Sequence, residues 1–176
     1  METRKLVLLA ILLSVSVVLN IVERVALGGF TGLPMVRLGL ANVVILIVLY
    51  VYGLKDAFTL LLLRIFLVGV FTALFSPTFW LSLGGGLTAF TLMVTFKSVR
   101  IFSILGVSVM GAFGHALGQV VVAMILLSTQ ELILYLPFLV GLSIPTGIFT
   151  GLIARKMVGL LHQSLPNLEF KTPSQS

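Results

Sequence analysis

Apolar residues run in long stretches, separated by short segments that hold most of the charged and turn-forming residues. A membrane hydrocarbon core about 30 Å thick is crossed by a helix of about 20 apolar residues. The pattern predicts an all-α, polytopic fold with six transmembrane helices. We expect one membrane domain over residues 1–160 and a polar cytoplasmic tail over 161–176. The predicted spans cover residues 5–23, 36–52, 57–75, 79–96, 101–128 and 132–154.

The composition excludes a water-soluble globule. Apolar residues make up 59% of the chain and charged residues only 9%, whereas soluble domains carry roughly 25% charged residues. Intrinsic disorder is excluded as well, because it requires low hydrophobicity and high charge. The net charge of +6 is spread over short segments between apolar stretches. A nucleic-acid interface, which needs a clustered basic face, is therefore not expected.

The basic residues predict the orientation of the chain. Six spans place both termini on one side of the membrane, and most of the basic residues fall on that side. Cytoplasmic loops of membrane proteins carry an excess of Lys and Arg, so both termini are expected in the cytoplasm of a multi-pass cell-membrane protein. The opposite side has Arg24 and Arg37. The residues on the cytoplasmic side are Arg4, Lys5, Lys55, Lys97, Arg100, Arg155, Lys156 and Lys171.

Polar side chains enter three of the predicted spans at similar depth, nearer the external side. Such residues are costly in a membrane and mark functional sites. In the first span they recur at spacings of three and four, on one helix face, and in the fifth span two polar residues lie four apart. We therefore expect a small-molecule site near the external side. Its candidate residues are Asn20, Glu23, Arg24, Arg37, Asn42, His115 and Gln119.

Each of these residues also has a structural interpretation. Glu23 and Arg24 are suited to an ion pair at the membrane surface, and Asn42 or His115 to a hydrogen bond with a neighbouring helix. Arg64, a further candidate, lies about 10 Å into the third span. Its guanidinium either reaches back to the inner surface or faces a bound anion inside the bundle.

The connection over residues 25–36 is rich in glycine and apolar residues. Because glycine permits unusual backbone angles, the connection is interpreted as a lid over the site, with an ordinary connector as the alternative. Its turn-forming residues are Gly28, Gly29, Gly32 and Pro34.

Small residues in three spans predict close helix packing. Ala10 and Ser14 are spaced as a small-xxx-small pair on a different face of the first span from Asn20. They are expected to meet either a neighbouring helix of this chain or a partner protein. The glycines that also predict close helix packing are Gly84, Gly85, Gly86, Gly111, Gly114 and Gly118.

The residues needed for several kinds of catalysis are missing from the sequence. There is no cysteine and no phosphate-binding loop of the G-x-x-x-x-G-K-[ST] type. Asp56 is the sole aspartate, so the carboxylate clusters that hold magnesium around a diphosphate are absent. We expect a protein that is not an enzyme and uses no metal or cofactor. Any ATP-driven step would need a partner.

Several short segments resemble the Gx transporter family, also labelled heptaprenyl diphosphate synthase component I. The resemblance covers nearly the whole chain, from the first span to Lys156. The matching segments are Arg37 to Asn42 (R-L-G-L-A-N), Leu63 with Arg64, Gly106 to Gly111, Gly114 to Gln119 (G-H-A-L-G-Q), and Gly147 to Arg155.

That family is in turn similar to the S components of ECF (energy-coupling factor) transporters. The resemblance implies a six-helix fold with a ligand near the external side, under the first loop. It also implies a transmembrane T component and two ATPases as partners. In S components an A-x-x-x-A pattern in the first helix docks on the T component, and Ala10 with Ser14 matches it with one conservative change.

The leading hypothesis is therefore the substrate-binding subunit of an ECF-type importer. Guanidinium groups pair well with carboxylate or phosphate, so the expected ligand is a small anionic or amphipathic molecule, such as a vitamin or an isoprenoid or quinone precursor. Two alternatives remain. One is a non-catalytic membrane subunit associated with prenyl diphosphate synthesis, and the other is a small standalone carrier.

Overall fold

The computed structural model describes residues 2–28, 39–99 and 101–164. Over these ranges the chain is helical and contains no β-strand, as the apolar pattern predicts. Six α-helices and one 3-10 helix follow one another. Their bounds are α1 (Glu2–Gly28), α2 (Asn42–Val51), α3 (Leu54–Thr72), α4 (Pro77–Ser98), α5 (Ile104–Leu127), η1 (Gln130–Tyr135) and α6 (Leu136–Ser164).

The short helix α2 lies at the centre of the molecule. It contacts α1, α3, α4, α5 and α6, and every residue from Asn42 to Val51 except Tyr50 is buried. A helix that is apolar on all sides is stable only when it is surrounded by other helices. The main apolar core accordingly forms around α2, with α1 packed against α2 and α3 at one side of the molecule.

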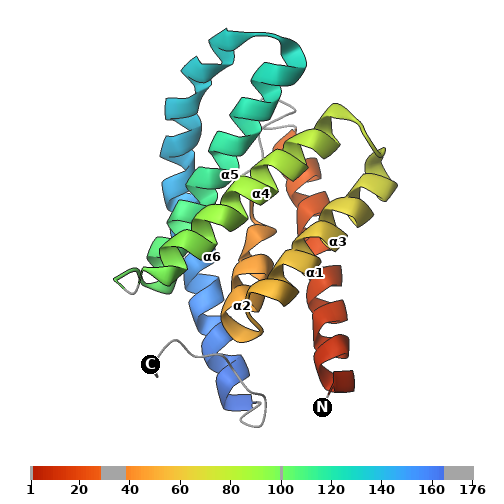
Figure 1. The fold of residues 1–176 in the computed structure, drawn as a ribbon, viewed down its shortest axis with the longest axis vertical. Helices are drawn as coiled ribbons and strands as arrows, with labels where there is room; N and C mark the ends of the chain where they lie inside the picture. The colour runs from red at the N-terminus through yellow and green to blue at the C-terminus, as the bar shows by residue number, and fades with distance from the viewer. Residues whose placement is uncertain (1, 29–38, 100, 165–176) are drawn as a thin grey trace.

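The long helices run between two ends of the molecule. Figure 1 shows the first residues of α1 and the last residues of α6 at the same end, and the connections from α3 to α4 and from α5 to α6 at the other. Within the described part of the chain, four segments are long and apolar enough to cross a membrane: Thr3–Val25, Pro77–Ser98, Ile104–Leu127 and Gln130–Gln163. These helices indicate a membrane protein.

Helices α2 and α3 differ from these four segments. Helix α2 has 10 residues, about 15 Å of helix, which is about half the thickness of a hydrocarbon core. Helix α3 has 19 residues and carries Lys55, Asp56 and Arg64. The apolar pattern thus predicted the positions of the helices, while two of them do not have the length and composition of a full span.

Several predicted boundaries were wrong. Helix α1 continues to Gly28 rather than ending at Glu23, so residues 25–28 of the predicted lid connection are helical. The second helix was expected from Val36 but begins at Asn42, because Gly39 has a φ of 78° and residues 39–41 form a turn. Helix α3 ends at Thr72 rather than at residue 75, because Ala73 and Phe75 have φ angles of 118° and 60°. The last helix continues beyond residue 154 to Ser164, so residues 161–164 of the predicted tail are helical.

Helices α4 and α5 form the most extensive helix pair. A Cβ built on Gly118 of α5 would lie 2.5 Å from the main-chain oxygen of Gly84 in α4. The hydroxyl of Thr88 in α4 donates to the main-chain oxygen of Gly114 in α5, at 2.7 Å. The close packing predicted from the glycines is confirmed, and it holds the polar residues of α5 against α4.

Candidate functional site

The polar face of α1 points into the bundle. Ser16, Asn20 and Glu23 are all buried, at spacings of four and three residues that place them on one helix face. Large apolar residues of α1, including Val18 and Val22, are exposed. The predicted inward polar face of the first helix is confirmed for Asn20 and Glu23, and Ser16 lies on the same face.

Glu23 binds the backbone where the chain enters α2. One carboxylate oxygen accepts a hydrogen bond from the N–H of Gly39 at 2.6 Å, and the other accepts one from the N–H of Leu40 at 3.1 Å. Nearby, the hydroxyl of Ser16 donates to the main-chain oxygen of Ala41 at 3.3 Å. Helix α1 therefore holds residues 39–41 at three main-chain atoms.

Arg64 lies inside the bundle, and the alternative in which it reaches the inner surface was wrong. Its side chain is 3% exposed, and Nη2 donates a hydrogen bond to Oδ1 of Asn42 at 3.1 Å. Because a guanidinium can only donate, this contact fixes which end of the Asn42 amide is the oxygen. The amide nitrogen Nδ2 of Asn42 is thereby directed elsewhere.

His115 lies between the start of α2 and helix α4. A Cβ built on Gly39 would lie 3.0 Å from Cδ2 of the His115 ring and 2.9 Å from Nδ2 of Asn42. A Cβ built on Gly85 would lie 2.9 Å from both Cε1 and Nδ1 of His115 and 2.9 Å from Cγ of Gln119. Glycine at these two positions leaves room for the histidine ring.

These contacts link polar side chains from four helices. We call Glu23, Asn42, Arg64, His115 and Gln119 the polar cluster. All five side chains are buried, and Asn20 is buried on the same face of α1 as Glu23. The sequence predicted these residues but not the glycines at their centre. Gly39 belongs to the R-L-G-L-A-N segment, and Gly85 was interpreted only as a helix-packing residue.

The polar cluster and the neighbouring face of α1 have unused hydrogen-bonding capacity. Among the described residues, the buried amide nitrogens of Asn42 and Gln119 and the amide oxygen of Asn20 have no hydrogen-bond partner. A buried polar atom in this state costs about 1–3 kcal/mol. Two of these atoms are donors, and the guanidinium of Arg64 adds a positive charge. Such a set of groups is suited to a bound carboxylate or phosphate oxygen.

The remaining predicted site residues lie outside the described residues or near the end of α1. Arg37 and the lid residues Gly29, Gly32 and Pro34 lie outside the described residues. Gly28 is the last residue of α1. Arg24 follows Glu23 on α1 and is half-buried.

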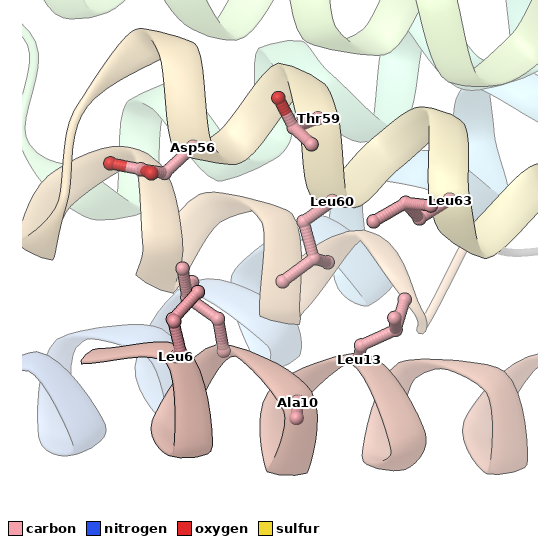
Figure 2. Close-up of a pocket in the computed structure, with 8 residues that line it drawn as sticks. Leu6, Ala10, Leu13, Asp56, Thr59, Leu60 and Leu63 are labelled. Carbon is pink, nitrogen blue, oxygen red and sulfur yellow. The ribbon is translucent and has the colours of Figure 1, made fainter. Parts of the chain in front are cut away.

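A second feature is an apolar groove of about 320 Å³ between α1 and α3. Figure 2 shows Leu13 of α1 and Leu60 of α3 facing one another across it. An ion pair between Lys5 and Asp56, at 2.8 Å, joins the two helices at the start of α3. The other lining residues are Leu6, Leu9, Ala10, Thr59 and Leu63.

The predicted docking residues Ala10 and Ser14 are both exposed on α1. The hydroxyl of Ser14 donates to the main-chain oxygen of Ala10 at 2.9 Å. Because its hydrogen bond is made within the helix, Ser14 presents little polarity to lipid or to another helix. Ala10 also borders the groove.

Comparison with known proteins gives one family. Residues 12–157 match the family described as Heptaprenyl diphosphate synthase component I, and this range contains the whole polar cluster. No curated protein and no solved structure matches the chain. The chain therefore belongs to the Heptaprenyl diphosphate synthase component I family.

Proposed function

We propose that the protein is the substrate-binding membrane subunit of an ECF-type importer, and that the polar cluster binds the anionic end of a small amphipathic molecule. The observation that carries this proposal is the buried Arg64–Asn42 pair, together with the unpartnered amide nitrogens of Asn42 and Gln119 among the described residues. The proposal does not include catalysis by this chain.

The charge of the cluster favours an anion. Arg64 brings a buried positive charge into the cluster, and its Nη2 donates to Oδ1 of Asn42; buried charges of this kind in membrane proteins mark functional sites. The carboxylate of Glu23 already accepts two main-chain hydrogen bonds. A carboxylate or phosphate group of a ligand would complement Arg64, and the apolar side chains around the cluster would hold its ring or chain.

The position of the cluster favours entry from outside the cell. Glu23 lies near the end of α1 and Asn42 at the start of α2, so both are far along the chain from the N-terminal end of α1. The basic residues predict that this N-terminal end is cytoplasmic. Under the proposal the protein is a multi-pass cell-membrane protein whose site opens away from the cytoplasm, with Arg24 near the entrance.

Import against a gradient would require partners. The sequence lacks a nucleotide-binding loop, so the proposal includes a transmembrane T component and ATPase subunits. Support for a docking surface on α1 comes from its exposed outer face, on which Ala10 and Ser14 form a small-residue pair. Small residues of this kind permit close approach of a second helix in the membrane.

The family description favours a second candidate, a non-catalytic membrane subunit associated with prenyl diphosphate synthesis. Prenyl transfer needs magnesium held by several carboxylates. The sole aspartate, Asp56, is paired with Lys5, so a separate aspartate-rich enzyme would have to perform the chemistry. This candidate requires a synthase partner and no ATPase.

Native mass spectrometry of the protein gently purified from its own membrane tests the proposal. We expect a co-isolated anionic small molecule with the wild type, and its loss with Asn42→Ala and with Gln119→Ala. Glu131→Gln, an exposed change in η1, is the control and should retain the molecule. Equal retention by all variants would remove the polar cluster from the site.

The proteins that copurify distinguish the candidates. The importer predicts a T component and ATPases, whereas the second candidate predicts a soluble synthase. Uptake into liposomes that contain this chain alone would favour a standalone carrier and contradict the need for partners.

A further inference from the structure

Glu23 is a buried acidic residue whose two oxygens each bind a main-chain N–H group. The two N–H groups belong to consecutive residues, Gly39 and Leu40, which lie 16 and 17 positions further along the chain. A carboxylate that receives two N–H groups in this way forms charge-assisted hydrogen bonds, which are stronger than neutral ones.

The backbone that Glu23 binds lies against the proposed ligand site. Gly39 has a φ of 78°, in the left-handed region that favours glycine. Gly39 also lies close to two cluster residues. A Cβ at this position would be 2.9 Å from Nδ2 of Asn42 and 3.0 Å from Cδ2 of His115. A shift of Gly39 would therefore change the space available to the side chains of Asn42 and His115.

The hydrogen bonds of the turn connect it to α2. The N–H of Asn42 donates to the main-chain oxygen of Gly39 at 2.9 Å, so the orientation of the Gly39 peptide affects the first residue of α2. Asn42 is also the residue that binds Arg64. A continuous set of contacts thus runs from Glu23 through Gly39 to Asn42 and Arg64.

We propose that Glu23 is a positioning residue of the binding site and does not itself touch the ligand. It holds the Gly39–Leu40 backbone in the conformation that sets the places of Asn42 and His115. This inference rests on the proposed function, because the contact matters for binding only if the polar cluster receives a ligand. It also replaces the expectation that Glu23 binds the ligand directly.

The geometry requires a glutamate. Glutamine has one acceptor oxygen, and its amide nitrogen would face an N–H donor, so only one of the two hydrogen bonds would remain. Aspartate keeps both oxygens but is one methylene shorter, which withdraws them from Gly39 and Leu40. Both Glu23→Gln and Glu23→Asp should therefore loosen the turn, and the two changes differ in charge.

Amide hydrogen exchange of the full-length protein in lipid nanodiscs, followed by NMR, tests the contact itself. In the wild type the amides of Gly39 and Leu40 should be protected. In Glu23→Gln at least one of the two should exchange at least about tenfold faster, the effect of losing one strong hydrogen bond. The ring signals of His115 should shift as well. Glu131→Gln is the matched control, and the ring of His162, at the far end of α6, is the internal reference.

If the amides of Gly39 and Leu40 exchange without protection in the wild type, the inference is overturned and no variant is needed to decide it. Unchanged exchange and unchanged His115 signals in Glu23→Gln would also overturn it. If that variant does not fold, Glu23→Asp provides the same comparison with the charge retained.

Titration with benzoate and phenyl phosphate, two small anions with an apolar ring, separates this inference from the proposed function. We expect the wild-type His115 signals to respond to at least one probe, with binding at least about tenfold weaker in Glu23→Gln. Equal binding by both proteins would overturn the role of Glu23 and leave the anion site standing. If the amides of Gly39 and Leu40 are protected but the wild-type His115 signals respond to neither probe, the result would instead contradict the anion site.

Discussion

The ammonium group of Lys97, in the last turn of α4, donates a hydrogen bond to the main-chain oxygen of Leu49 in α2, at 2.5 Å. It also lies 4.6 Å from the centre of the Tyr50 ring. The last carbonyl groups of a helix have no partner within that helix, and a nearby cation complements their partial negative charge. Lys97 thus supports the end of the short central helix.

Replacing Lys97 with methionine should lower the free energy of unfolding by about 1.5–3 kcal/mol, the usual range for a hydrogen bond to a charged group. Methionine keeps much of the side-chain length but cannot donate to Leu49. Thermal unfolding in detergent provides the measurement. Lys156→Met, an exposed change in α6, should leave the midpoint nearly unchanged, and an equal loss in both variants would contradict the interpretation.

Replacing Arg64 with methionine should abolish co-isolation of an anionic ligand while leaving the fold intact. The change removes the donor to Oδ1 of Asn42, and a buried acceptor that loses its partner costs about 1–3 kcal/mol, so a moderate loss of stability is expected as well. Native mass spectrometry reports the ligand, and thermal unfolding reports stability. The exposed change Arg155→Met is the control. Retention of the ligand by Arg64→Met would contradict the proposed role of the guanidinium.

Replacing Gly118 with alanine should destabilise the α4–α5 pair. The new Cβ would lie 2.5 Å from the Gly84 oxygen and would also overlap the Thr88 hydroxyl. Overpacking of this kind typically costs about 1–3 kcal/mol. The matched control is Gly141→Ala in α6, where nothing lies within 4 Å of the new Cβ. We expect the control to be neutral or slightly stabilising in thermal unfolding, and similar losses in both variants would show that the packing is looser than described.

Replacing Asp56 with asparagine should have little effect on stability. Its ion pair with Lys5 is partly exposed, with side-chain exposures of 38% for Lys5 and 24% for Asp56. Such pairs contribute about 0–1 kcal/mol. The expected shift of the unfolding midpoint is therefore small, and it should shrink further at high salt. A loss of several kcal/mol would mean that the α1–α3 contact depends on this pair.

The apolar pattern predicted the helices well because burial in lipid or in the core requires long apolar stretches. It failed at Gly39 and Ala73, where the helix boundary depends on backbone angles. Hydropathy carries no information about such angles, so the start of α2 and the end of α3 were misplaced by several residues.

The inward polar residues were also predictable, because helical spacing placed Asn20 with Glu23 and His115 with Gln119. The groups that these residues bind could not be predicted. A partner for Arg64 was sought among the acidic residues, and the neutral amide of Asn42, which accepts a hydrogen bond from its guanidinium, was not anticipated. Glu23 was expected to bind a ligand, yet it binds main-chain N–H groups of Gly39 and Leu40, which no side-chain pattern reveals.

The bonds from Glu23 to Gly39 and Leu40 have a consequence for membrane insertion. Unpaired main-chain N–H groups are poorly tolerated in hydrocarbon, and the N–H groups before α2 obtain their acceptors from the preceding helix. As the chain leaves the ribosome, α1 is made first. The carboxylate of Glu23 is therefore already present when residues 39–41 emerge. The first two helices are thus expected to pack together early, with the acidic group of Glu23 shielded by the peptide that it binds.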